Sequence, residues 1–188
     1  MSIRFVRLLA VFLSLTLGVF SMSASEAAAL DPENTIYLDL PAGRVVIQLR
    51  PDLAPGHVAR IKELTRKGFY DGLKFHRVIP GFMAQTGDPQ GNGMGGSGQK
   101  LKAEFSKEPH VRGTVSMARA ASPDSGDSQF FICFDDASFL NGQYTVWGQV
   151  VSGMEFVDKI KKGTSSNNGE VSDPTKIVKM TVAADEKK

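Results

Sequence analysis

Cysteine is almost absent from this chain, because Cys133 is the only one in 188 residues. An intramolecular disulfide is therefore excluded, and the fold has to rest on its packed core. The neighbours Phe131, Ile132 and Phe134 are apolar, which predicts that the Cys133 thiol is buried. A reactive thiol, or one paired with another chain, is the alternative.

Long apolar runs are also scarce, and the one that occurs lies near the start of the chain. Leu8 to Phe20 is almost entirely apolar, follows Arg4 and Arg7, and precedes a stretch of small residues. This pattern is typical of a secretory signal peptide. A retained membrane anchor, the alternative, needs roughly 20 apolar residues. We therefore predict a signal peptide at 1–29, cleaved within 24–29, and an exported protein in the periplasm of a Gram-negative bacterium, with no membrane association after cleavage.

Neither sign of charge is in excess. The chain has a formal charge of +2, and residues 30–188 contain 20 basic and 19 acidic side chains. A near-neutral surface offers no electrostatic footprint for nucleic acid or anionic lipid, so we expect no nucleic-acid partner. About 160 residues are enough for one domain with a substantial core. We predict a single domain at 30–188 and expect a monomer.

Clustered metal ligands and a nucleotide-binding motif are lacking as well. The histidines His57, His76 and His110 are far apart and have few ligand-type neighbours, so we expect no metal site. Residues 91–96 match the spacing G-x-G-x-x-G, but the loop continues after them where that motif needs a helix. We interpret this segment as a tight surface loop whose glycines supply positive φ angles, and we expect no cofactor.

Alternation of apolar and polar residues is the dominant pattern of the chain. Val45, Ile47 and Leu49 share one face of a predicted strand at 44–50, and a second strand at 36–40 precedes it. Ala42-Gly43 between them predicts an opening hairpin. Further strands are predicted at 74–78, 82–86, 114–117, 129–134, 145–150 and 177–182. Eight short strands indicate a closed antiparallel barrel or a sandwich.

Two segments have helical spacing instead. Behind Pro55, the apolar residues Val58, Ile61 and Leu64 recur every third position, and Gly68 ends the pattern as a C-terminal glycine would. A second, shorter pattern covers 154–161. Two helices so far apart in the sequence fit the two open ends of a barrel.

Two blocks of sequence carry most of the functional information. Residues 75–88, FHRVIPGFMAQTGD, put a guanidinium, two large apolar side chains and an amide within nine residues, with no nucleophile beside a base. Residues 128–133, SQFFIC, add an amide and aromatic surface. Together they resemble the cyclophilin family of peptidyl-prolyl cis–trans isomerases, whose pattern reads FHRxIPGFMxQxGD and then SQFFI. The resemblance extends from about Thr35 to Val182. It implies a mainly β fold, a closed eight-stranded antiparallel barrel capped by two α-helices, with the active site on its outer face.

The resemblance also implies a role for each residue of this site. Arg77 would be the catalytic hydrogen-bond donor to the proline nitrogen, and an arginine stays charged without a titrating partner. His76, its neighbour on an alternating strand, would face away and have an orienting or packing role. The implied substrate-binding residues are Phe82, Met83, Phe131 and Leu140 around the proline ring, Gln85 and Gln129 as amides that hold Arg77 and the substrate, Ala118 and Arg119 beside the peptide main chain, and Phe139 and Tyr144 on the groove wall.

Four features depart from the common eukaryotic pattern and resemble bacterial cyclophilins. Phe139 replaces a tryptophan, Tyr144 a histidine and Arg119 an asparagine, and the segment 120–127 is one residue longer. The tryptophan donates a hydrogen bond to cyclosporin, which phenylalanine cannot do, so we expect weak cyclosporin binding.

The predicted function is isomerisation of X-Pro bonds during the folding of exported proteins. Its partners would be proline-containing polypeptides that are unfolded or extended. The alternative is a proline-peptide binding module or holdase chaperone without significant turnover. Binding-only relatives are expected to lose the cation first, whereas Arg77, Phe82 and Gln129 are all present here.

Overall fold

The computed structural model describes residues 30–186. The signal peptide predicted at 1–29 lies outside this range. Within the described range, no helix is long and apolar enough to cross a membrane.

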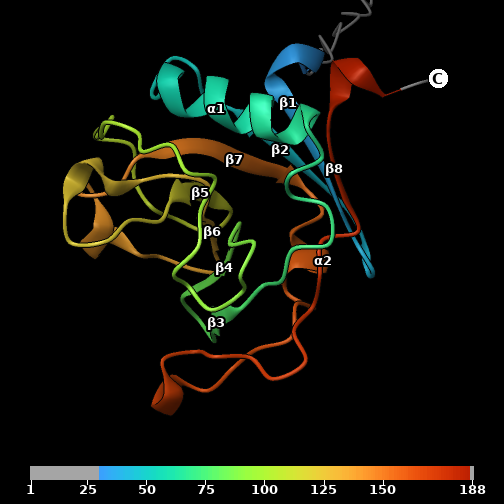
Figure 1. Ribbon diagram of the computed structural model, residues 1–188, viewed down its shortest axis with the longest axis vertical. Coiled ribbons are helices and arrows are strands. Elements are labelled where there is room, and N and C mark those ends of the chain that lie inside the picture. Colours follow the sequence, from blue (N-terminus) through green and yellow to red (C-terminus); the bar gives the residue numbers. More distant parts are fainter. Residues whose placement is uncertain (1–29, 187–188) are drawn as a thin grey trace, which may run out of the picture.

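Eight antiparallel strands form one strongly curled sheet (Figure 1). All eight predicted strands are present, with ends within three residues of those expected. They are β1 (Thr35–Leu40), β2 (Gly43–Leu49), β3 (Arg77–Ile79), β4 (Met83–Thr86), β5 (Thr114–Met117), β6 (Phe130–Cys133), β7 (Val146–Ser152) and β8 (Lys179–Val182). Their order in the sheet is β3-β4-β6-β5-β7-β2-β1-β8.

The prediction of a closed barrel is wrong, because β3 and β8 are the two edges of an open half-barrel. The segment 169–177 runs beside β3 and the residues before it, and connects to them through irregular hydrogen bonds, such as Val78 N to Gly169 O at 2.7 Å and Phe75 N to Thr175 O at 2.9 Å. Within or next to this segment, Asn168, Gly169 and Asp173 have positive φ angles. Such residues cannot continue a strand, so no regular ladder closes the sheet.

The first helix, α1 (Pro55–Arg66), lies across one end of the sheet (Figure 1). Its N-cap residue, Ala54, has no side-chain oxygen, and the Glu104 carboxylate accepts hydrogen bonds from the free N–H groups of Gly56 and His57 at 3.0 and 2.9 Å instead. Gly68 follows the helix with a φ of +66°, as the pattern predicted.

The second helix, α2 (Met154–Val157), is shorter than predicted. After Val157 the chain continues in turns, in which Lys159 N bonds to Phe156 O and Ile160 N to Val157 O, three residues back in each case. The apolar spacing over 154–161 therefore reflects burial of Val157 and Ile160 in the core and not two turns of α-helix.

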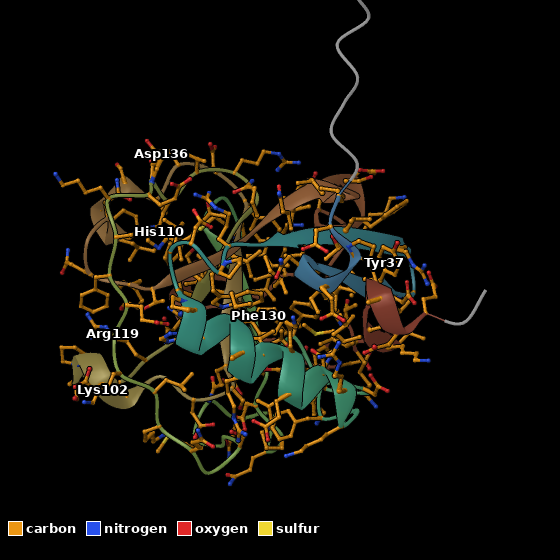
Figure 2. The ribbon with its side chains drawn as sticks, turned by 90° about the horizontal axis from the view of Figure 1, so that it is seen from above. Tyr37, Lys102, His110, Arg119, Phe130 and Asp136 are labelled. Carbon is orange, nitrogen blue, oxygen red and sulfur yellow. The ribbon has the colours of Figure 1, made fainter. Side chains whose placement is uncertain are left out.

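Strands β5 and β6 are buried on both faces, which separates two clusters of apolar side chains. Phe130 and Ile132 belong to the main core, where Phe130 packs edge-on against Trp147 at 5.3 Å and lies behind α1 in Figure 2. Phe131 and Cys133 belong to a smaller cluster on the other face of the sheet. Cys133 is buried as predicted, and burial raises the pKa of its thiol to about 12.

Candidate active site on the outer face of the sheet

The register of four strands arranges the predicted site residues in a row. Arg77 on β3 lies opposite Gln85 on β4, Gln85 lies opposite Phe131 on β6, and Phe131 lies opposite Ser116 on β5. Side chains directly opposite one another in a sheet lie on the same face. Alternation thus sends Phe130 and Ile132 to the main core and presents Phe131, with Arg77 and Gln85, on the outer face.

A cavity of about 250 Å³ opens above this row. Ten of the eleven predicted site residues line it: Arg77, Phe82, Met83, Gln85, Ala118, Arg119, Phe131, Phe139, Leu140 and Tyr144. Gln129, the eleventh, lines an adjoining hollow of about 220 Å³ together with Lys100 and Asp127. The structure therefore brings together residues that are up to 67 positions apart in the sequence.

Most of the residues that line the cavity are apolar or aromatic. Met83, Phe131 and Leu140 are buried in the smaller cluster, and the Phe131 and Tyr144 rings meet edge to face at 5.9 Å. Phe82 lies in the turn before β4, so it escapes the alternation of the strand and lines the cavity together with its neighbour Met83. Phe139, on the short 3-10 helix η3 (Ser138–Leu140), is 64% exposed at the rim.

Arg77 is one of the two arginines that line this cavity, and neutral oxygens hold it. Its Nε donates to the main-chain oxygen of Asn168 at 3.1 Å, Nη2 to Asn168 Oδ1 at 2.9 Å, and Nη1 to Gln85 Oε1 at 3.1 Å. A guanidinium has five N–H bonds, so two remain for a ligand. Burial lowers the pKa of Arg77 from its ordinary value, but an arginine side chain stays protonated at neutral pH.

Two glutamine amides fix the orientation of this donor. Gln129 Nε2 donates to the main-chain oxygens of Gly93 and Gly95, at 3.0 and 2.8 Å. Its oxygen accepts from Gln85 Nε2 at 2.9 Å, which turns the Gln85 oxygen toward Arg77. The glycine-rich loop at 91–96, interpreted from sequence as a surface loop, therefore anchors the hydrogen-bond chain that ends at Arg77.

Sequence reasoning missed Asn168, which supplies two of the three acceptors for Arg77. Its φ of +57° belongs to the left-handed region, where asparagine is favoured among residues other than glycine. The pair Asn168-Gly169 is a recognisable turn signal. That signal does not show that the turn lies against a residue 91 positions earlier.

The histidines lie around the site and not in it. His76 is buried and does not line the cavity. His110 is buried beneath the cavity, where its ring stacks on Phe131 at 6.2 Å and its Nε2 lies 2.9 Å from Ser116 Oγ. Burial lowers the pKa of both histidines, so both are neutral at neutral pH.

Residues 35–182 match the family model for cyclophilin type peptidyl-prolyl cis-trans isomerases. The chain belongs to this family. Among the relatives, a probable peptidyl-prolyl cis-trans isomerase of Brucella suis is 58% identical over 190 aligned positions, covering 95% of each chain. Peptidyl-prolyl cis-trans isomerase B of Bacillus subtilis is 48% identical over 64% of this chain and 85% of its own.

Solved structures agree with the fold. Cyclophilin AquaCyp293 from Hirschia baltica has a TM-score of 0.75 at 28% identity, covering 84% of this chain and 77% of its own. A cyclophilin type peptidyl-prolyl cis-trans isomerase from Cryptosporidium parvum, solved in the presence of the dipeptide ala-pro, has a TM-score of 0.72 at 27% identity, covering 79% of this chain and 98% of its own.

Proposed function

We propose that this protein accelerates the cis–trans isomerisation of X-Pro bonds while exported proteins fold. The observation that carries the proposal is the Arg77 guanidinium, which lies in the wall of an apolar cavity with two N–H bonds unused by the described residues. The match to the isomerase family and the relatives named above support it.

The reaction breaks no bond, and it is slow because amide resonance imposes a barrier of ~18–20 kcal/mol. As the C–N bond twists, the proline nitrogen loses conjugation, and its lone pair becomes a hydrogen-bond acceptor only near the transition state. A donor held beside that nitrogen binds the twisted amide better than either planar form. Arg77 is that donor in this proposal.

The apolar walls complete the mechanism by holding the proline ring. The surface beside Arg77 that would contact the proline ring is aromatic and aliphatic, and comes from Phe82, Met83, Phe131 and Leu140. These side chains have no polar groups that the ring would leave without a hydrogen bond. The two amides, Gln85 and Gln129, hold the Arg77 guanidinium in one orientation before the substrate binds. No free energy is then spent on orienting this donor in the transition state.

The test is turnover of a short X-Pro peptide, measured by NMR exchange, with the wild type and with Arg77→Ala and Arg77→Lys. Removing a donor that acts mainly in the transition state should lower kcat/KM by at least about 100-fold, equivalent to about 2.7 kcal/mol. The lysine variant should also be slow, because it lacks the planar guanidinium that three oxygens of Asn168 and Gln85 now hold. Urea unfolding curves provide the control and should change little.

Near-normal turnover by a folded Arg77→Ala would contradict the role of Arg77. A wild type that binds proline peptides, as seen in chemical-shift titrations, but does not isomerise them would favour the alternative of a binding module or holdase.

Export rests on the sequence of residues 1–29, which lie outside the described range. The whole chain should be expressed in a Gram-negative host and the periplasmic fraction examined by mass spectrometry. We expect a mature form that begins within residues 25–30. Full-length protein found only in the cytoplasm would contradict export.

A further inference from the structure

Seven arginines lie in the described part of the chain, and they fall into two groups. Five of them form ion pairs with carboxylates: Arg44, Arg50, Arg60, Arg66 and Arg112. Arg77 and Arg119 form none within residues 30–186, and both line the cavity described above. In the proposed function Arg77 is the hydrogen-bond donor, and the charge of Arg119 has no role.

The Arg119 side chain is held in place without being neutralised. Its Nε donates to the main-chain oxygen of Gln143 at 3.1 Å, and its Nη1 to those of Ala120 and Ala121 at 3.0 and 3.2 Å. The guanidinium carbon lies 4.6 Å from the centre of the Tyr144 ring. Nη2 has no hydrogen-bond partner in the described range, so its two N–H bonds are available, and little side-chain entropy is left to lose on binding.

The charges around Arg119 also favour a negative ligand. Arg119 lines both the proline cavity and the adjoining hollow, and Figure 2 shows it on the side of the molecule opposite Tyr37. The charged residues that line the two hollows are Arg77, Arg119 and Lys100 against one carboxylate, Asp127. That carboxylate is buried, accepts from Ser97 N at 2.6 Å and Ser97 Oγ at 2.5 Å, and pairs with Lys100 Nζ at 3.5 Å. Arg77 and Arg119 are therefore the two charges of these hollows without an ion-pair partner in the described range.

We propose that Arg119 is a specificity residue that binds a carboxylate of the client polypeptide, so that this isomerase prefers prolines with an aspartate or glutamate close by. The inference rests on the proposed function and names a substrate class for the same groove. Arg119 lines the same cavity as Arg77 and the residues around the proline ring. Because an extended chain advances about 3.3 Å per residue, we expect the acidic residue within about three positions of the proline. The whole chain is nearly neutral, so it should not attract acidic proteins in general. The preference should depend on acidic residues that enter the groove.

The experiment scans glutamate through the three positions on either side of the proline in an otherwise neutral, end-capped peptide. Each peptide is matched by one with glutamine in the same place, which has the same shape without the charge. NMR exchange gives kcat/KM, and chemical-shift titration gives the affinity independently of turnover. At low ionic strength the wild type should favour glutamate about three- to tenfold at one of the positions, and 0.5 M salt should reduce the preference.

Four variants separate the role of Arg119 from other effects. Arg119→Gln should lose the preference, Arg119→Glu should reverse it so that the glutamine peptide is favoured over the glutamate peptide, and Arg119→Lys should retain most of it. Arg66→Gln is the matched control, because it removes the same charge from the exposed end of α1, where Arg66 pairs with Glu33 and Asp185. This control should keep the wild-type preference.

Equal rates and affinities for all glutamate and glutamine pairs would overturn the inference, as would a preference that survives in Arg119→Gln. Should Arg119→Gln fail to fold, the salt dependence of the wild type and the behaviour of Arg119→Lys decide instead. The glutamine peptides separate the two proposals: their turnover tests the isomerase function alone, and only the difference between glutamate and glutamine tests Arg119.

Discussion

Arg77 depends on a residue that comes late in the chain, Asn168, for two of its three hydrogen bonds. We expect Asn168→Gly to lower kcat/KM about tenfold with a nearly unchanged KM, because it removes the Oδ1 acceptor while glycine keeps the left-handed backbone and its main-chain oxygen. Asn168→Asp keeps the acceptor but adds a negative charge beside the guanidinium, so it should also lower kcat.

The two variants should differ in the mobility of Arg77, measured by ¹⁵N relaxation of its Nε–H group. The guanidinium should be more mobile in Asn168→Gly and more rigid in Asn168→Asp. Unchanged turnover in Asn168→Gly would limit Asn168 to a role in the loop.

Phe139 lines the cavity at its rim, where its ring lies 5.3 Å from that of Phe82. The family resemblance implies that a tryptophan here donates a hydrogen bond to cyclosporin. We expect Phe139→Trp to strengthen cyclosporin inhibition about tenfold, since a net hydrogen bond contributes roughly 0.5–1.5 kcal/mol and an unpaired acceptor costs ~1–3 kcal/mol. Peptide turnover should stay within a few-fold, because both rings provide apolar surface. Inhibition of turnover is the readout, and equal inhibition of both proteins would contradict the prediction.

At the scale of elements, the loop at 163–170, which contains the short 3-10 helix η4 (Ser165–Asn167), packs closely against β3. Val78 N donates to Gly169 O, and Gly163 N donates to Val78 O, so β3 is bonded on its outer edge by this loop. A Cβ atom on Gly169 would lie 2.5 Å from Ile79 Cγ1 and 3.0 Å from the main chain of Val78. The loop therefore positions β3, and with it Arg77, through contact between main chains.

We expect Gly169→Ala to lower the free energy of unfolding by more than about 2 kcal/mol and to lower turnover as well. The new methyl group must displace β3, and a φ of +79° adds a penalty of about 1–2 kcal/mol for a residue with a Cβ. Gly72→Ala is the matched control, because its φ is +77° but no atom lies within 4 Å of the added Cβ. Urea denaturation compares the two, and equal losses would mean that backbone strain alone acts at Gly169.

At the scale of the whole molecule, two buried histidines make stability depend on pH. Burial holds the pKa values of His76 and His110 below the ordinary value near 6.5, so the unfolded chain binds more protons than the folded one below that pH. The free energy of unfolding should therefore fall as pH decreases from 7 to 5 and should not depend on these groups above pH 7. Carboxylates with lowered pKa values, such as Asp88 and Glu104, lose their contribution only near or below their ordinary pKa, around pH 4.

Urea denaturation at pH 5, 6, 7 and 8 measures this dependence, and His110→Gln should show a smaller decrease than the wild type. An unchanged decrease in both His110→Gln and His76→Gln would contradict the assignment to these histidines.

Turnover should respond to pH differently from stability. Arg77 keeps its charge and no residue exchanges a proton, so kcat/KM should be flat between about pH 6 and 8. A change of kcat/KM with pH near the ordinary pKa of histidine, in protein that stays folded, would contradict the mechanism as proposed.

The strands and α1 could be predicted from local patterns in the amino-acid sequence, whereas the residues of the candidate site were predicted from the resemblance of residues 75–88 and 128–133 to the cyclophilin family. Alternation predicted the hairpin of β1 and β2, and Pro55 and Gly68 marked the ends of α1. The register that sets Arg77 opposite Gln85, and the placement of Phe131 and Ile132 in different clusters, came from the structure.

Other features depended on contacts between segments far apart in the chain. The sheet stays open because Asn168, Gly169 and Asp173 have positive φ angles beside β3, and α2 ends early because Ile160 is buried without a helical turn. Asn168 reaches Arg77, His110 packs beneath Phe131, and Arg119 has no carboxylate partner within the described range, because of where the folded chain places their neighbours. Local patterns decide which residues form an element and which face they take, whereas the pairing of distant side chains is decided only when the elements pack.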